Sequence, residues 1–564
     1  MRLMANAKTD HKPGALALAI RQQFGWRKEE AGPLTVWFKG YGRVQDTARL
    51  IEQLSALGSR PGTGDLSRLA MWLDGHFALV AQTPDWTLAA VDRVRSIPVA
   101  FAKGPEGWIV NGQAGRLREK LGLTTVNDGA ALALAMSGYT IDRATLFEGV
   151  EQLGPGEFVL FRPDERPLRH RYYCYRPWRA DKPAYDAEGS RRALAETTLS
   201  IIDAMMKSIG DRILVVPLSA GRDSRLIVSA AHHLGYRNIL TFAYGRKGNH
   251  EAQASKEIAE RLGFKWRFVP TDTKFMRDYF SSSAWGEYCR FADTLQSVPF
   301  VQDLPQIQVL KGDGYIPDDA VFANGNSGDF ISGNHVIAPI DEVPDGFGAQ
   351  QRRERIVKTL CSKHFSLWDA LRTPENTRTV RGQINASINR EGIEFGDPAD
   401  DYGIYEYAEF QDRQCKYVIT GQRIYEFLGH EWRLPLWDNA LLDFFEGIPL
   451  EGKREQNLFA RTLDEENWGG VWKGVPVNRK TIRPGWVRPL RWAAKAVHAP
   501  LGREKWHAFE KRYFGYWIEQ GSQSAIRPYG DVARDTRGAR HGIAWLTEAY
   551  LHCHDIPLEA RTSG

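Results

Sequence analysis

The sequence predicts an α/β protein with a parallel, doubly wound sheet, and three successive strand segments joined by helices carry this prediction. The apolar run 213–216 predicts a buried strand, and residues 226–234 predict the helix after it. Residues 238–245 and 265–270 predict two further strands, separated by a helix over 249–263. Connections this short give parallel strands, and the ligands of such sheets bind at the carboxyl ends of the strands.

Length and composition indicate a multidomain globular protein. A chain of 564 residues is too long for one hydrophobic core, so two or three domains are expected. No apolar run approaches the roughly 20 residues that cross a bilayer, and the start shows no signal-peptide pattern. The five cysteines are scattered and show no paired spacing, which favours neither a disulfide framework nor a zinc site. The expected location is therefore the reducing cytoplasm.

The turn after the first predicted strand, residues 217–224, is the most informative segment. It is rich in small residues, and the N–H groups of such a turn, with the positive end of the next helix, bind phosphate. The Gly-Lys-Ser/Thr ending of a Walker A loop is missing. Residues 219–224 instead resemble Ser-Gly-Gly-x-Asp-Ser, the pyrophosphate loop of enzymes that split ATP into AMP and pyrophosphate, with Ala220 replacing the first glycine. An ordinary polar turn is the alternative.

Later segments extend this resemblance in the same order along the chain. Residues 241–245 resemble a Ser/Thr-Phe-x-x-Gly strand that contacts adenine, and residues 324–333 resemble Ser-Gly-Glu-Gly-Ala/Ser-Asp-Glu-x-Phe-Gly-Gly. Residues 431–438 resemble Glu-x-Arg-x-Pro-Phe-Leu-Asp, and residues 478–486 loosely resemble an Arg-x-Lys segment ahead of a Gly-aromatic pair. These are hallmarks of the asparagine synthetases and their amide-forming relatives, so the chain is similar to that family.

The N-terminal part resembles the glutaminase domain of the same family, which is a sandwich of two sheets. Residues 73–80 resemble one of its strands, residues 90–101 one of its hairpins, and residues 153–158 the segment that leads out of the domain. Glutaminases of this kind use a cysteine exposed as residue one. Residue 2 is Arg2 and the first cysteine is Cys174, so we expect this domain to lack glutaminase activity and to be a structural remnant.

The motifs also predict the domain boundaries. The polar, proline-containing stretch 162–183 predicts a linker, a helix is expected over 186–209, and residues 335–400 predict helical insertions around the site. The expected domains are a degenerate glutaminase-like domain over 1–165, a synthetase-like ATP-pyrophosphatase domain over 185–480 and a basic helical extension over 481–564.

The resemblance implies an ATP-dependent carbon–nitrogen ligase that activates a carboxylate as an acyl-adenylate, with ATP and Mg²⁺ as cofactors. A carboxylate in an anion-binding loop makes sense if magnesium lies between it and the phosphates, so Asp223 is an expected metal ligand. Asp329 matches the first acid of the family's Asp-Glu pair, and the resemblance implies that it binds the same metal from across the cleft. The alternative for Asp223 is an acid at the N-terminus of a helix, and the alternative for Asp329 is a turn-forming residue. Lys480 is expected to stabilise charge on phosphate and carbonyl oxygens, a plain surface lysine being the alternative. The residues expected to bind ATP are Leu218, Ser219, Gly221, Asp223, Ser224, Tyr244 and Gly325.

Two departures from the family pattern affect the substrate. Asn326 stands where asparagine synthetases have a glutamate that helps the ammonia-consuming step, and Phe330 stands where they have another acid. The residues expected to act in the adenylation step therefore match the family pattern better than those expected to act in the step that consumes the amine. The favoured hypothesis is a ligase that uses ammonia or another amine with a small-molecule carboxylate. The alternatives are a catalytically impaired scaffold or regulatory homologue that binds ATP, and an ATP pyrophosphatase acting on tRNA or a nucleotide.

Positive charge is concentrated at the C-terminal end of the chain. The net charge is +5, and residues 471–564 contain 16 Lys and Arg against 8 Asp and Glu. This segment predicts a basic face for an anionic partner such as nucleic acid, a membrane surface or an anionic carbohydrate. The alternative is a solvated helical surface with tryptophans as packing residues, which the dispersed placement of the cations favours.

Overall fold

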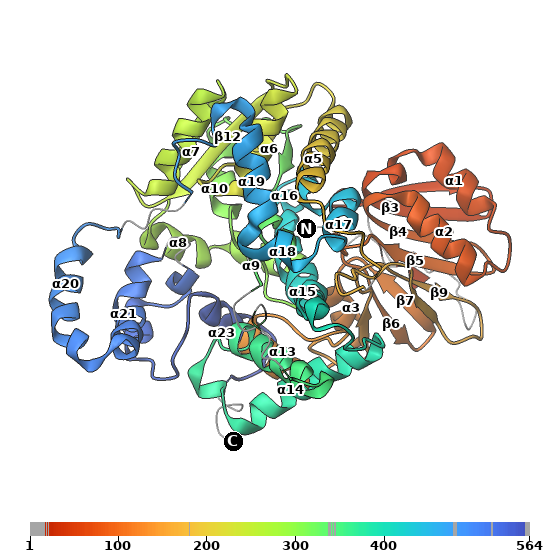
Figure 1. Cartoon of the computed structure of the whole chain (residues 1–564). Helices are drawn as coiled ribbons and strands as arrows, with labels where there is room; N and C mark the ends of the chain where they lie inside the picture. Colours follow the sequence, from red (N-terminus) through yellow and green to blue (C-terminus); the bar gives the residue numbers. More distant parts are fainter. Residues whose placement is uncertain are drawn as a thin grey trace. The chain divides into compact units, whose positions relative to one another are not determined.

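The computed structural model describes residues 17–18, 20, 22–179, 181–336, 340, 342, 346–477, 482–519 and 523–558. These residues form two compact units (Figure 1). The first consists of the described residues of Met1–Thr125 and Phe147–Cys174, and the second of those of Val126–Leu146 and Tyr175–Gly564. The first unit thus continues beyond residue 165, where the sequence placed its end.

The first unit contains two β-sheets. One has the strand order β10-β9-β5-β4-β3-β2 and is antiparallel throughout, and the other has the order β1-β7-β6-β8 with β1 parallel to β7. The rings of Phe101 and Phe161 bring the two sheets into contact, with their centroids 5.5 Å apart. The elements are β1 (Ala17–Leu18), β2 (Arg27–Ala31), β3 (Leu34–Gly42), α1 (Thr47–Ser55), α2 (Thr63–Leu73), β4 (Gly75–Gln82), β5 (Thr87–Val91), β6 (Ala100–Gly104), β7 (Gly107–Asn111), α3 (Ala114–Leu121), β8 (Val150–Gln152), β9 (Glu157–Phe161) and β10 (Leu168–Arg171).

Three sequence predictions for this unit are wrong in detail. Residues 90–101 are not a hairpin, because β5 belongs to the six-stranded sheet and β6 to the four-stranded one. Residues 153–158 do not lead out of the unit, because they enter β9, which lies between β10 and β5 in the larger sheet. The predicted linker over 162–183 contains β10, whose Leu168 pairs with Leu160 of β9. Strand pairing with distant residues decided these cases, and a local pattern does not record it.

The second unit is built on a five-stranded parallel sheet with the order β13-β12-β11-β14-β15, as the sequence predicted for its first three strands. The strand order reverses between β11 (Leu214–Pro217) and β14 (Val321–Ala323), which creates the switch point where doubly wound sheets bind ligands. The other strands are β12 (Ile239–Gly245), β13 (Lys265–Pro270) and β15 (Glu431–Arg433).

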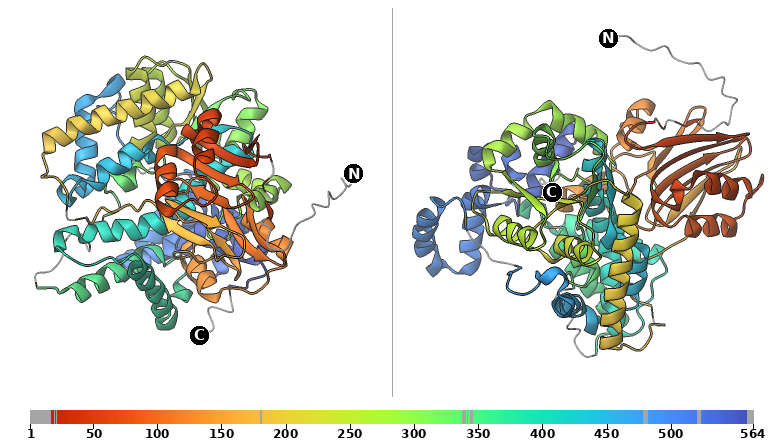
Figure 2. Two further views of the ribbon diagram at one scale, coloured as in Figure 1. Left: turned by 90° about the vertical axis from the view of Figure 1, so that its right-hand side faces the viewer. Right: turned by 90° about the horizontal axis from the view of Figure 1, so that it is seen from above.

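The helices flanking the first strands begin and end for local reasons. Helix α6 (Arg222–His233) starts four residues before the predicted 226, directly after the turn at Gly221, and Gly235 follows it with a φ of +90°. Asn249 caps α7 (His250–Arg261) by accepting a hydrogen bond from Ala252 N at 2.8 Å. Asp186 caps α5 (Ala187–Ile209), the long yellow helix of Figures 1 and 2.

The remaining helices of the second unit include the predicted insertions over 335–400, which are α13 and α14. These helices are α4 (Asp128–Ser137), α8 (Thr273–Phe280), α9 (Ser283–Ala292), α10 (Leu304–Gly312), α11 (Gly328–Ile331), α13 (Ala349–His364), α14 (Pro374–Arg390), α15 (Asp401–Glu409), α16 (Arg423–Phe427), α17 (Asn439–Glu446), α18 (Leu450–Lys453), α19 (Asn457–Glu466), α20 (Val487–His498), α21 (Arg503–Ile518), α22 (Tyr529–Arg534) and α23 (Ile543–Cys553).

The segment predicted as a C-terminal extension is helical where it is described, but it belongs to the second unit. Helix α23 is largely buried, and its Tyr550 hydroxyl donates to Asp293 Oδ1 at 2.6 Å. Its Thr547 Oγ1 accepts a hydrogen bond from Trp368 Nε1 at 3.3 Å. Residues beyond 481 therefore help to build the core of this unit.

Candidate functional site

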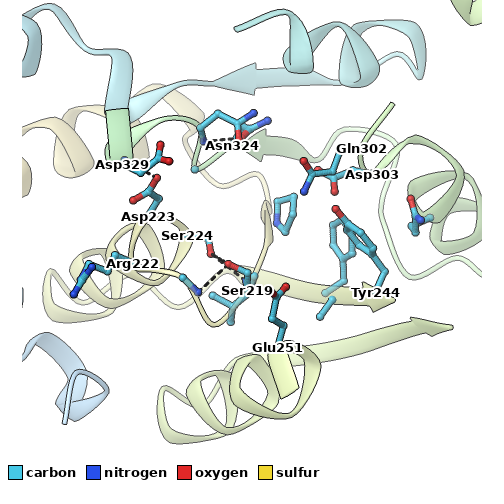
Figure 3. Close-up of a pocket in the computed structure, with 18 of the residues that line it drawn as sticks. Ser219, Arg222, Asp223, Ser224, Tyr244, Glu251, Gln302, Asp303, Asn324 and Asp329 are labelled. Atoms are coloured by element: carbon cyan, nitrogen blue, oxygen red, sulfur yellow. Dashed lines mark hydrogen bonds between the residues drawn. The ribbon is translucent and has the colours of Figure 1, made fainter. Parts of the chain in front are cut away.

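A cavity of about 590 Å³ lies at the carboxyl ends of β11, β12 and β14, within the second unit (Figure 3). Its position is the one that the predicted sheet assigns to a ligand. Every described residue that the sequence predicted for the site lines this cavity. They are Leu218, Ser219, Gly221, Asp223, Ser224, Tyr244, Gly325 and Asp329. Lys480 lies outside the described residues, so its predicted role stays a prediction.

The turn between β11 and α6 is closed on itself by two serine side chains. Ser224 Oγ accepts a hydrogen bond from Ser219 N at 3.1 Å, and Ser219 Oγ accepts one from Gly221 N at 3.1 Å. The two hydroxyls lie 3.3 Å apart at the cavity wall. The N-terminus of α6, with its positive dipole end, therefore opens onto the cavity together with two hydroxyl groups, and both features attract a phosphate.

A buried arginine holds this turn from behind. The guanidinium of Arg225 donates to the carbonyl oxygen of Ala220 and to that of Val475, the latter at 3.2 Å. Arg225 is fully buried, and its guanidinium lies 5.2 Å from the Trp472 ring centroid. The turn is thereby fixed to the segment after α19, which is distant in sequence.

Glycines let the loop after β14 approach the start of α6. A Cβ on Gly325 would lie 2.9 Å from Ser224 N, and one on Gly328 would lie 2.8 Å from Asp223 Oδ1. Real Cβ atoms do not come so close to backbone or to a held carboxylate, so only glycine fits both positions. This close approach brings the two motifs, about a hundred residues apart in sequence, into one site.

The carboxylates of Asp223 and Asp329 meet across this contact. Asp329 N donates to Asp223 Oδ2 at 3.1 Å. Burial, and then the charge of Asp329, raise the pKa of Asp223 to about 8. Burial acts in the same direction on Asp329, but the hydrogen bond to His335 and the charge of that imidazole outweigh it and lower the pKa. With no metal ion beside the pair, Asp223 therefore holds a proton at neutral pH while Asp329 stays ionised.

A buried network continues from Asp329 away from the cavity. His335 Nε2 lies 3.2 Å from Asp329 Oδ2, and His335 Nδ1 contacts Glu409. Burial would lower the pKa of His335, but the carboxylates of Glu409 and Asp329 outweigh it and raise the pKa to about 9. The imidazole is thus held as a cation between two carboxylates, which fixes the direction of the Asp329 side chain.

Glu409 anchors this network at the point where α15 passes into a π-helical segment, Phe410–Val418. Its carboxylate is fully buried and also contacts Lys363, His364 and Arg413 at 3.2–3.4 Å. His335 and Glu409 were not predicted from the sequence. The break in helical register at residue 410 is a feature typical of functional sites, but no residue pattern signals it.

The opposite end of the cavity is formed by hydroxyl groups around a buried carboxylate. Asp303 accepts a hydrogen bond from the Tyr425 hydroxyl at 3.4 Å and another from Tyr244. Burial raises the pKa of Asp303 to about 6, although the two hydroxyls oppose the shift. Asn324 Nδ2 donates to the same Tyr425 hydroxyl at 3.3 Å. Tyr244 was predicted, whereas the sequence analysis missed Asp303 and Tyr425.

The two departures from the family pattern have different structural roles. Phe330 is fully buried, and its ring centroid lies 5.6 Å from that of His335 and 6.1 Å from that of Trp437. It is therefore a packing residue behind the carboxylates. Asn326 lines the cavity, and its backbone N–H donates to Asn324 Oδ1 at 2.8 Å. An uncharged amide thus occupies the wall beside Gly325.

A second cavity of about 1080 Å³ lies between α13 and the helices after residue 503. Glu519 lines both cavities, and its carboxylate accepts hydrogen bonds from Gly542 N at 3.2 Å and from Ser524 Oγ at 3.4 Å. Burial raises the pKa of Glu519. The C-terminal helices therefore contribute a carboxyl group to the wall of the predicted site.

The carboxylates of Asp223 and Asp329 suit magnesium better than a transition metal. Mg²⁺ uses one or two carboxylates and completes its shell with water and substrate phosphates. Among the described residues, no group of three or more His, Cys, Asp and Glu is placed to hold a metal ion. The paired carboxylates, which face the turn between β11 and α6, fit Mg²⁺ in this respect.

Comparison with known proteins gives only distant structural matches. No family model and no curated protein matches the sequence. Among solved structures, glutamine phosphoribosylpyrophosphate (PRPP) amidotransferase from B. subtilis, complexed with ADP and GMP, matches with 12% identity and a TM-score of 0.18, over 44% of this chain and 73% of that one. The structure of the allosteric regulatory enzyme of purine biosynthesis matches with 12% identity and a TM-score of 0.17, over 44% of this chain and 62% of that one. Neither match supports a functional argument.

In the described residues, no helix is long and apolar enough to cross a membrane.

Proposed function

We propose that the protein is an ATP-dependent carbon–nitrogen ligase that activates a carboxylate as its acyl-adenylate and transfers the acyl group to an amine or ammonia. One observation carries the proposal. The residues that the sequence assigned to ATP, and the two acids that it assigned to magnesium, line one cavity at the switch point of a parallel sheet. They come from three separate motifs, and no local pattern required them to meet.

In this proposal the β11–α6 turn binds the pyrophosphate part of ATP. The N–H groups at the start of α6 and the hydroxyls of Ser219 and Ser224 face the cavity and supply hydrogen-bond donors. The substrate carboxylate attacks the α-phosphate, its oxygen forms the new bond to phosphorus, and pyrophosphate leaves. The product of this step is the acyl-adenylate, in which AMP is the leaving group. An amine then attacks the acyl-adenylate, AMP leaves, and the amine loses a proton.

Asp223 and Asp329 would hold magnesium, which when bound neutralises phosphate charge. The chain itself fixes these two acids. Backbone N–H groups of Gly328 and Asp329 hold Asp223, and the His335 cation, backed by Glu409, holds Asp329. Glu409 is a positioning residue in this scheme, since it acts on Asp329 only through His335.

The far end of the cavity would accommodate the nucleoside or the acid substrate. Tyr244, Asp303 and Asn324 present hydroxyl, carboxyl and amide groups there, which recognise polar hydrogen-bonding ligands. Glu519 is the carboxyl group that the C-terminal helices add, and burial raises its pKa, which makes its carboxylate a stronger base for the proton released by the amine.

A second candidate is a catalytically impaired homologue that binds ATP as a scaffold or regulator. Asn326 and Phe330 favour it, because neither side chain supplies the acid found in asparagine synthetases. The two proposals differ in one measurable reaction. A ligase exchanges labelled pyrophosphate into ATP when its acid substrate is present, whereas a scaffold binds ATP without exchange.

ATP–pyrophosphate exchange against a panel of carboxylic acids tests the ligase proposal. Exchange that depends on one acid and on magnesium supports it. Absence of exchange with every acid, together with calorimetric evidence that ATP binds, supports the scaffold. Failure to bind ATP at all would refute both proposals and the assignment of the cavity.

A further inference from the structure

Helix α20 carries the most exposed apolar surface of the described chain. Eight large hydrophobic side chains stand out as exposed, and five of them lie between residues 486 and 501. Their exposed fractions are 53% for Trp486, 55% for Leu490, 78% for Trp492, 70% for Val497 and 55% for Leu501. A single exposed leucine needs no explanation, but a cluster of this kind marks an interaction surface.

The inner face of α20 packs on α21, so the helix is held in place and presents its other face outward. Figure 1 shows the two helices side by side at the edge of the second unit. The His498 ring stacks on Phe509 with centroids 3.9 Å apart, and the side chain of Arg491 contacts both Glu510 and the Trp506 ring. Val487 is buried on the same face. The cluster is thus built on an anchored helix.

The outer face of α20 has an apolar band with a basic edge. Leu490 and Val497 are seven residues apart and lie along one line of the helix, and Trp486, whose ring packs on that of Trp517, directly precedes its first residue. Arg488 and Lys495, also seven apart, lie along another exposed line, and Trp492 stands beside it. An apolar face with tryptophan and a lysine- and arginine-rich border is the pattern of helices that lie in the membrane interface.

The charge of the surrounding segment identifies the kind of surface that fits. Residues 482–519 contain 8 Lys and Arg against 3 Asp and Glu. Anionic lipid attracts such a segment, while tryptophan prefers the depth of the lipid headgroups. The phosphates of a nucleic acid would pair with the Lys and Arg side chains, but the apolar band would remain exposed to water. A lipid surface with negative charge satisfies both features at once.

We propose that α20 docks this protein on an anionic lipid surface, with the band from Trp492 to Leu490 entering the headgroup region and Lys495 and Arg488 facing the headgroups. This mode requires no spanning helix, in keeping with the described residues. It is independent of the ligase proposal, because no residue of the outer face lines the cavity at the switch point.

Vesicle flotation of the full chain tests the proposal. The probes are vesicles of equal parts phosphatidylglycerol and phosphatidylcholine, and vesicles of phosphatidylcholine alone. We expect binding to the anionic vesicles that weakens as salt is raised, and much weaker binding to the neutral ones. Trp492→Gln combined with Val497→Gln should weaken binding by at least about tenfold, since two largely exposed apolar side chains lose their burial in lipid. Lys495→Gln should weaken it by about fivefold.

Matched controls come from exposed apolar residues elsewhere. Val309→Gln in the second unit and Met71→Gln in the first remove side chains that are 38% and 46% exposed, and neither should change binding. Circular dichroism and the thermal midpoint check that all variants are folded, which is expected because the altered side chains face solvent. Wild-type protein that stays in solution with anionic vesicles overturns the proposal, as does equal binding by the Trp492 and Val497 variant.

Two other occupants give distinct results. If α20 joins two copies of the chain, the Trp492 and Val497 variant shifts the protein to monomer in sedimentation while no vesicle binding is seen. If the surface binds nucleic acid, an oligonucleotide is retarded and Lys495→Gln weakens this while the apolar variant does not. Either result, without vesicle binding, overturns the proposal.

Discussion

Replacing Asp223 with asparagine is expected to stabilise the protein while abolishing adenylation. The amide keeps the size of the side chain and still accepts the hydrogen bond from Asp329 N, which is 3.1 Å in length. What is lost is the negative charge that faces Asp329. A group whose replacement raises stability and removes activity is one that the fold keeps for function.

The stability effect has a sign and a pH window. Asp223 has its pKa at about 8 in the folded state, against 3.8 for an unperturbed aspartate. Because the folded state holds this proton more tightly than the unfolded state, wild-type stability falls as the pH rises from about 4 to about 8. The difference corresponds to at most about 6 kcal/mol. Allowing for relaxation around the charged group, we expect the variant to be more stable by about 2–4 kcal/mol at pH 8 and equal at pH 4.

Two measurements on the same preparations decide this prediction. Thermal unfolding in magnesium-free buffer at pH 8 and at pH 5 should show a gain of a few degrees that shrinks at the lower pH. Exchange of pyrophosphate into ATP should fall at least about a hundredfold. Asp319→Asn, at an exposed position away from the cavity, is the matched control and should change neither quantity. Exchange within about fivefold of wild type at limiting magnesium would refute the assignment of Asp223.

Three further predictions concern the far end of the cavity and the substrates. Asp303→Asn should stabilise the protein by about 3 kcal/mol above pH 6, because burial raises the pKa of Asp303 to about 6. The advantage of the variant over wild type should vanish as the pH falls to about 4. A difference in unfolding midpoint that does not depend on pH would contradict this prediction. Glutamine should not serve as a nitrogen source, since no cysteine precedes Cys174, and release of glutamate by pure protein at the rate of product formation would overturn this expectation. Aspartate, ATP, magnesium and excess ammonia should give little or no asparagine, because Asn326 has no acid to offer; stoichiometric asparagine and AMP in a mass spectrum would show that Asn326 tolerates the role.

The sequence alone predicted the strands β11, β12 and β13 of the parallel sheet and eight of the residues that line the candidate cavity. The strands over 239–245 and 265–270 and the helix between them, which Asn249 caps, depend on local patterns of apolar, capping and small residues, which the chain carries regardless of what packs on it. The parallel order of these strands then predicted that the turn at 217–224 and the end of the strand over 239–245 meet at one edge of the sheet. The loop at 324–333 was assigned to the same site only by the family resemblance, because the strand before it, β14, was not predicted.

Tertiary structure decided the parts that depend on partners distant in sequence. His335 and Glu409 became neighbours of Asp329 only because α15 and the loop after α11 pack together, and neither residue stands in a recognisable motif. The same holds for Asp303, for the strand β10 inside the predicted linker, and for Glu519, which the C-terminal helices bring to the cavity wall. Burial and the charges of contacting residues set the pKa of each such carboxyl group, and both quantities exist only once the chain has folded.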